Sequence, residues 1–173
     1  MIVVSDSTPL ITLMKAGQLD VLSKLFGDVL IPQAVYSELT ANENFPEEAK
    51  QIQNSEFLKV VAVEDEKAVS LLQRATGLDR GESEAIVYAD AIHSDFLLMD
   101  EVPGRRVASG MGLEIMGSIG VLINGFREGF ISESDVKMSF DRIRNTNRHI
   151  SERLLQDSLD IIRQEARNIK TEN

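Results

Sequence analysis

The chain contains no cysteine, no apolar run of membrane-spanning length and no charged leader ahead of its first apolar residues, Met1 to Val4. Without cysteine it can form neither a disulfide nor a zinc–thiolate site, and it cannot use a thiol nucleophile. Without a leader or a membrane span, we expect a soluble protein of the cytoplasm.

Positive charge is also scarce, since 28 acids against 18 lysines and arginines give a net charge of −10. Such a balance normally argues against a nucleic-acid partner, whose phosphates require basic side chains. The acidity is concentrated in residues 38–103, which carry 15 acids and 5 bases, or −10. Residues 104–153 carry 8 bases and 6 acids, or +2, so a basic surface remains available there.

Short apolar runs alternate with helical patterns along the chain. The runs at 2–5, 28–31, 58–63, 96–99 and 113–117 are predicted strands. Predicted helices separate and follow them, at 33–39, 47–54, 65–75, from 79, at 105–112, at 120–126 and at 132–144, and two short helices divided by Gly17 precede the second strand. The pattern predicts one domain over residues 1–150, a helical tail over 151–173, and a three-layer α/β/α sandwich around a mainly parallel sheet.

Acidic side chains follow two of the predicted strands at the point where each strand ends. Asp6 follows the first strand, and Asp100 with Glu101 follows the fourth. In open parallel α/β sheets the active crevice lies outside the carboxyl ends of the strands. If these two strands are neighbours, the acids converge there, together with Glu38 on the helix after the second strand and one acid of Gly81-Glu82-Ser83-Glu84.

Structural roles compete with a functional role for each acid. Thr8-Pro9 is a better helix start than Asp6, so we predict Thr8 as the N-cap and leave Asp6 available. Glu82 stands three residues after Asp79, which is the spacing of a capping box. Glu84 lies on roughly the opposite face of the same helix, and only one of the two glutamates can enter the crevice. A turn aspartate at Asp100 and a solvated Glu38 are ordinary alternatives.

Clustered carboxylates repel one another and stay ionised together only if a cation neutralises them. Ligands that are all oxygen select hard ions, Mg²⁺ or Mn²⁺, over zinc. Paired carboxylates acting as general acid and base are an alternative use, although they do not need so many acids. The sequence therefore favours a divalent metal site at the strand ends.

A resemblance to PIN-domain proteins is carried by three stretches of the chain: VVSDSTPLITLMKAGQLDVLSKLFGDVLIPQAVYSEL, LDRGESEAIVYA and LLMDEVPGRRVASGMGLEIMGSIGVLINGF. The last two are similar to a toxin-related branch of that superfamily, described only as predicted nucleic-acid-binding PIN proteins of unknown function. The resemblance spans about residues 2–131. It implies an α/β/α sandwich and a ribonuclease that depends on Mg²⁺ or Mn²⁺, of the type found as toxins in type II toxin–antitoxin pairs.

The resemblance also implies roles for individual residues. It places catalytic metal ligands at Asp6, Glu38 and Asp100, and a third acid in the Gly81–Glu84 segment. Glu82 keeps the longer distance to Asp100 seen in typical PIN nucleases and ranks above Glu84, while Glu101 is an additional ligand candidate. The third acid is a glutamate where most PIN toxins have aspartate. A catalytically weak module that binds nucleic acid or protein is the alternative function.

Candidate contacts to single-stranded RNA are the arginines of two basic runs, Arg105 and Arg106 in the first, and Arg142, Arg144 and Arg148 in the second. Pairing of the first run with Glu101, and a solvated helix end for the second, are the structural alternatives. The PIN resemblance implies a homodimer and a small antitoxin protein as partners. A narrow apolar seam in the tail, at Leu155, Leu159, Ile162, Ala166 and Ile169, would serve either partner or pack on the domain itself.

Overall fold

The computed structural model describes residues 1–41, 46–146 and 150–171 of the chain. Five strands form one sheet: β1 (Val3–Ser5), β2 (Val29–Pro32), β3 (Leu58–Val61), β4 (Phe96–Leu98) and β5 (Ile115–Met116). The sheet order is β3-β2-β1-β4-β5 and every pairing is parallel. β1 and β4 are direct neighbours, with Ser5 in register with Leu98. Asp6 and the acids after β4 therefore leave the same edge of the sheet.

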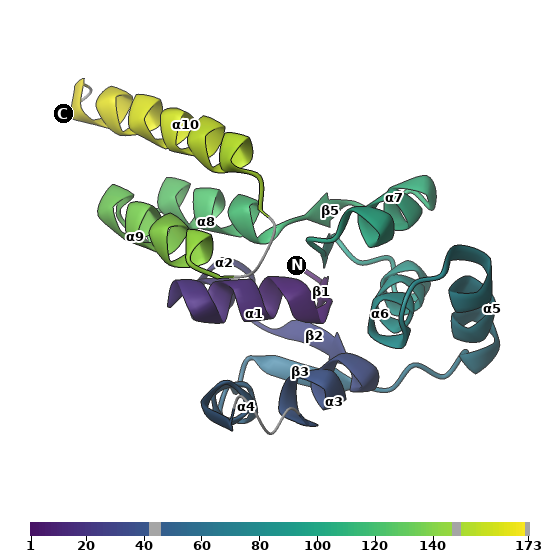
Figure 1. Ribbon diagram of the computed structural model, residues 1–173. Helices are drawn as coiled ribbons and strands as arrows, with labels where there is room; N and C mark the ends of the chain where they lie inside the picture. Colours follow the sequence, from purple (N-terminus) through teal and green to yellow (C-terminus); the bar gives the residue numbers. More distant parts are fainter. Residues whose placement is uncertain (42–45, 147–149, 172–173) are drawn as a thin grey trace.

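Helices follow or connect the strands (Figure 1). They are α1 (Ser7–Ala16), α2 (Val21–Phe26), α3 (Gln33–Ala41), α4 (Pro46–Gln53), α5 (Glu66–Thr76), α6 (Arg80–Ala91), α7 (Val102–Gly110), α8 (Ser118–Arg127), α9 (Glu133–Arg144) and α10 (Glu152–Thr171). In the described ranges, no helix is both long enough and apolar enough to cross a membrane.

Successive side chains of each strand point to opposite faces of the sheet, and each face carries its own core. Val3 and Leu98 belong to the larger core, which is covered mainly by α1, α2, α8, α9 and α10. Val4 and Leu97 belong to the smaller core, which α6 and α7 cover with small side chains such as Ala85. Figure 1 shows these two groups of helices on either side of the strands. The predicted three-layer α/β/α sandwich with a parallel sheet is confirmed.

Most of the predicted capping residues lie at the ends of helices in the structure. Ser132 accepts a hydrogen bond from the amide of Asp135, and α5 ends at Gly77 in the left-handed conformation, with φ of 76°. The prediction of Thr8 as the first N-cap is wrong, because α1 begins at Ser7 and Asp6 occupies the N-cap position. Proline is tolerated throughout the first helical turn, so Pro9 marks that turn and not its first residue. The Asp6 side chain nonetheless accepts no capping hydrogen bond.

The tail helix α10 packs on α8 and α9. Leu155, Leu159 and Ile162 are buried in the larger core, and Ala166 packs at its margin. The side chain of Ile169 lies outside the described part of the chain. The seam is therefore covered by its own domain, which is the second of the two predicted roles, and these buried residues form no partner surface. A division of the chain at residue 150 stays a prediction.

Candidate functional site

Asp6 lies at the carboxyl end of β1, where its amide donates to the carbonyl of Leu98 at 3.0 Å. Only 2% of its surface is exposed. Burial raises the pKa of the Asp6 carboxyl to about 7, and the negative charges of Glu82, Asp79 and Glu38 add to this effect, while the Ser7 amide opposes it. Asp6 is therefore a desolvated carboxyl that faces other carboxyls.

Glu82 lies in the first turn of α6 and is also buried. Its Oε2 accepts from the Asp79 amide at 3.1 Å while Asp79 Oδ1 accepts from the Glu82 amide at 2.8 Å, so the predicted capping box is present. Burial raises the pKa of Glu82, and the charges of Asp79, Glu101 and Glu38 raise it further against the Asp79 amide. The capping box uses one carboxylate oxygen. The other, Oε1, is directed towards Gly104 of α7.

Glu84 lies on the other face of α6 and has different neighbours. Its Oε1 accepts from Arg80 Nε at 2.7 Å, and its Oε2 accepts from the amide of Ala34 in the first turn of α3 at 3.0 Å. Both oxygens are therefore engaged with a cation and a backbone donor. Glu84 is not among the residues that raise the pKa of Asp6. These contacts favour Glu82 over Glu84 as the third acid of the site.

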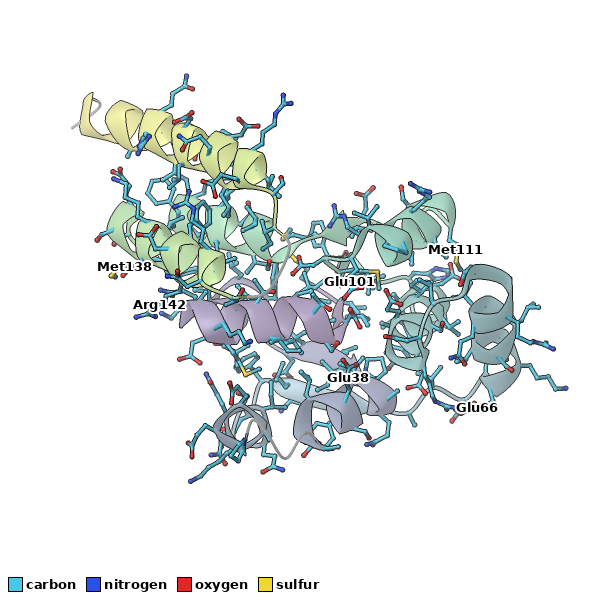
Figure 2. All side chains as sticks on the ribbon, viewed as in Figure 1. Glu38, Glu66, Glu101, Met111, Met138 and Arg142 are labelled. Carbon is cyan, nitrogen blue, oxygen red and sulfur yellow. The ribbon has the colours of Figure 1, made fainter. Side chains whose placement is uncertain are left out.

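The remaining acids surround the N-terminal half of α1, which supplies a hydroxyl to each of them. Ser7 donates to Glu38 and Thr8 donates to Glu101, both at 3.1 Å. In Figure 2 the labelled Glu38 and Glu101 lie on either side of this end of α1. One turn further along the helix, the Thr12 hydroxyl donates to the Thr8 carbonyl at 2.9 Å and lies 3.3 Å from Asp100 Oδ2, so its one proton is shared between the two acceptors.

Asp100 is held from its other side by the start of α8. The Ser118 amide donates to Asp100 Oδ1 at 2.7 Å, so this carboxylate caps a helix that begins at the end of the neighbouring strand. The hydroxyl of Ser118 is buried and has no partner among the described residues. Thr12 was missed because its role depends on how α1 packs against β4.

Three glycines lie against these carboxylates and leave room for them. A β-carbon built on Gly104 would lie 3.0 Å from Glu82 Oε1, and it would collide with the sulfur of Met99. One on Gly117 would lie 3.0 Å from Asp100 Oδ1, and one on Gly81 would lie 3.3 Å from Glu38 Oε2. The absence of a side chain at these positions therefore helps to set the carboxylate positions.

The donor set at this site suits a hard divalent cation, because it consists of carboxylate oxygens with hydroxyls behind them. Within the described ranges, no lysine or arginine forms an ion pair with Asp6, Glu82, Asp100 or Glu101. In those same ranges, no three acidic or histidine side chains are close enough together, as they stand, to hold one ion. The chemistry fits a metal, and ligation by three of these acids would require their side chains to move closer together.

The predicted basic contacts fall into two groups. Arg142 donates from Nη1 to the carbonyl of Ala16 at 3.0 Å, at the far end of α1 in Figure 2. Arg144 pairs with Glu152 and Asp141, joining α9 to α10, and Arg148 lies outside the described residues. Arg105 donates to the carbonyl of Met99 at 2.8 Å, and Arg106 is exposed. Arg105 and Arg106 thus have no carboxylate partner in the described structure, whereas Arg142 and Arg144 are held by the domain itself.

A three-layer α/β domain with carboxylates gathered where β1 and β4 end belongs to a class of folds that place their active crevice at this edge. The family model for the PIN domain matches residues 2–164, and the chain belongs to the PIN-domain family. The match ends within α10. Searches of curated proteins and of solved structures gave no match to this chain.

Proposed function

We propose that this protein is a metal-dependent ribonuclease of the PIN type. PIN domains are generally nucleases, and the chain belongs to that family. The observation that carries the proposal is Asp6, a carboxyl that is 2% exposed, faces other acids, and has no cationic partner among the described residues. A buried carboxylate without a cation is costly, and a bound divalent ion removes that cost.

In this proposal Asp6, Glu38, Glu82 and Asp100 hold Mg²⁺ or Mn²⁺, with Glu101 as an additional ligand. The bound metal would activate a water molecule and stabilise the leaving oxygen of a phosphodiester. The hydroxyl of Ser7 orients Glu38, and the Ser118 amide fixes Oδ1 of Asp100. The chain's own contribution is therefore a set of acids at the strand ends, several of which are held by hydrogen bonds.

The substrate that we propose is single-stranded RNA. The resemblance to toxin-related PIN proteins supports a place in a type II toxin–antitoxin pair, with a small antitoxin and a second copy of the chain as partners. Light scattering of the purified protein would test the second copy, and co-expression with the adjacent reading frame would test the antitoxin. A monomer that binds no such protein would leave the nuclease proposal intact and remove the toxin assignment.

A second candidate is a catalytically weak module that binds nucleic acid or protein. The spacing of the carboxylates favours it, because no three of those described are close enough to hold an ion without rearrangement. In that case the acids are structural, and they serve as hydrogen-bond acceptors for α1, α6 and α8.

Mn²⁺ titration of wild type, Asp6→Asn and Asp100→Asn separates the two candidates, with cleavage of a labelled single-stranded oligoribonucleotide measured in parallel. We expect wild type to bind Mn²⁺, to melt at a higher temperature with it, and to cleave. Both variants should lose these three properties. Asp90→Asn, an exposed acid further along α6, is the matched control and should behave as wild type. If Asp6→Asn still cleaves but melts early, Asp6 is a structural acceptor and the nuclease proposal fails.

A further inference from the structure

Two grooves flank the acids, and their charges differ. The first lies between α7 and β5, has a volume of about 560 Å³, and is lined on its α7 side by Arg105, Arg106 and Ser109. The second lies between α3, α5 and α6, has a volume of about 620 Å³, and is lined by Glu38, Glu66, Asp79, Glu84 and Arg80. Of the acids in the candidate metal site, Glu38 lines the second groove, and none lines the first.

The second groove is unsuited to a polyanion. Arg80 is the one cation in its lining, and that guanidinium is already bonded to Glu84 at 2.7 Å and to Glu66 at 2.6 Å. The remaining acids, Glu38 and Asp79, leave the lining net negative. Phosphates entering this groove would meet like charge on both walls, which disfavours them.

The first groove has the opposite balance. Glu114 is the only acid in its lining, against Arg105 and Arg106. Arg106 makes no hydrogen bond or ion pair with the residues that the structure describes, and Arg105 uses one nitrogen for the Met99 carbonyl. In a chain of net charge −10, two adjacent arginines without a carboxylate partner are available for an anion from outside.

Arg105 connects this groove to the acids. A β-carbon on Gly117 would lie 3.2 Å from Arg105 Nη1 and 3.0 Å from Asp100 Oδ1, so both groups lie beside the same glycine. The bond to Met99 fixes Arg105 at the end of β4, next to where Asp100 begins the following turn. A phosphate held by Arg105 would thus be adjacent to the candidate metal site without entering it.

We propose that the groove between α7 and β5 binds the sugar–phosphate backbone of single-stranded RNA, with Arg105 and Arg106 contacting its phosphates. The inference rests on the proposed nuclease function and adds a direction to it. The RNA leaves the acids over the α7–β5 side of the domain, and the groove between α3 and α6 stays free of it.

Salt-dependent binding tests the groove independently of catalysis. Anisotropy of a fluorescein-labelled single-stranded oligoribonucleotide is measured in EDTA over a series of KCl concentrations. Each phosphate contact contributes about 0.7 to the slope of log K against log salt for a single strand, so Arg105→Gln/Arg106→Gln should reduce the slope by about 1.4. The corresponding double lysine variant should keep the slope. Glu114→Gln should strengthen binding several-fold.

The matched control is Arg153→Gln/Arg163→Gln, which removes the same charge from α10, where both side chains are exposed. Its slope should equal that of wild type. An unchanged slope in the groove variant, or an equal reduction in the control, would contradict the proposal that RNA binds in this groove. In Mn²⁺, the groove variant should show KM raised at least tenfold with little change in kcat. If the protein binds RNA through the groove but does not cleave it, the nuclease proposal fails and the proposal of RNA binding in the groove is kept.

Discussion

On helix α6, Glu82 and Glu84 lie two positions apart and are both buried, with 7% and 4% of their surface exposed. The face that carries Glu84 supplies a cation, because Arg80 Nε lies 2.7 Å from the carboxylate. The face that carries Glu82 supplies one backbone donor, the Asp79 amide, but no cation, and the charges of Asp79, Glu101 and Glu38 are all negative. The chain itself thus supplies a cation that offsets the cost of burying Glu84, but it supplies none for Glu82. An external cation is therefore expected to bind on the face of α6 that carries Glu82.

The largest expected difference between the two faces is in metal-dependent cleavage. We expect Glu82→Gln to lose more than the roughly 10–100-fold that is typical for loss of an outer-shell partner, because it removes a proposed ligand. Glu84→Gln should retain cleavage and instead lose about 1–3 kcal/mol of unfolding free energy, since Arg80 and the Ala34 amide lose a charged acceptor. Cleavage rates with Mn²⁺ and chemical denaturation of both variants measure the contrast.

The opposite result for the two variants would contradict these roles of Glu82 and Glu84. If Glu84→Gln lost cleavage at unchanged stability while Glu82→Gln kept it, the third acid would be Glu84. Asp79→Ala is a useful companion, because it removes the N-cap acceptor of the Glu82 amide without removing a proposed ligand. It should lower stability and keep most of the cleavage.

Much of this arrangement could be predicted from the sequence, because strand and helix patterns are local. All five strands were predicted, and the alternation with helices correctly predicted parallel pairing. The capping box of Asp79 and Glu82 was predicted from spacing alone. Spacing also put Glu82 and Glu84 on opposite faces of α6, but it did not decide between them. That choice depends on α3 approaching one face and β1 the other, which is a tertiary contact.

Other features could not be predicted, because they depend on packing between distant segments. Arg142 appears in the densest basic run of the chain, yet its guanidinium binds the carbonyl of Ala16, 126 residues earlier. Thr12 looks like an ordinary helical residue until α1 packs beside the end of β4. The error at Thr8 was local in origin, since proline indicates the first turn of a helix without fixing its first residue.

The pH dependence of stability without metal should distinguish the two faces next. The pKa of Asp6 is raised to about 7, whereas an unfolded aspartate titrates near 3.8. Between these values the unfolded chain binds fewer protons at Asp6, so this group makes the protein less stable as pH rises from about 4 to about 7. Asp6→Asn should remove that loss, which amounts to at most about 4 kcal/mol. The difference in melting temperature between variant and wild type in EDTA should therefore grow across this range.

Glu84→Gln is the control for this measurement, because its carboxylate is paired with Arg80 on the other face. Its melting temperature should stay below that of wild type at pH 7, where Asp6→Asn lies above wild type. Saturating Mn²⁺ should raise the melting temperature of wild type and leave that of Asp6→Asn unchanged. If the melting temperatures of Asp6→Asn and wild type changed in parallel with pH, the ionisation of Asp6 would not destabilise the folded protein.

The smallest expected effect concerns the space beside Glu82. Gly104 and Gly110 both lie in α7, but a β-carbon on Gly110 would have no neighbour within 4 Å, whereas one on Gly104 would lie 3.0 Å from Glu82 Oε1. Gly104→Ala should lower Mn²⁺ affinity several-fold by displacing Glu82, while Gly110→Ala keeps wild-type affinity. Because the added carbon also meets the sulfur of Met99, Gly104→Ala should lose stability as well as affinity. Wild-type Mn²⁺ affinity in Gly104→Ala would show that Glu82 tolerates displacement, and would remove the argument that this glycine positions a ligand.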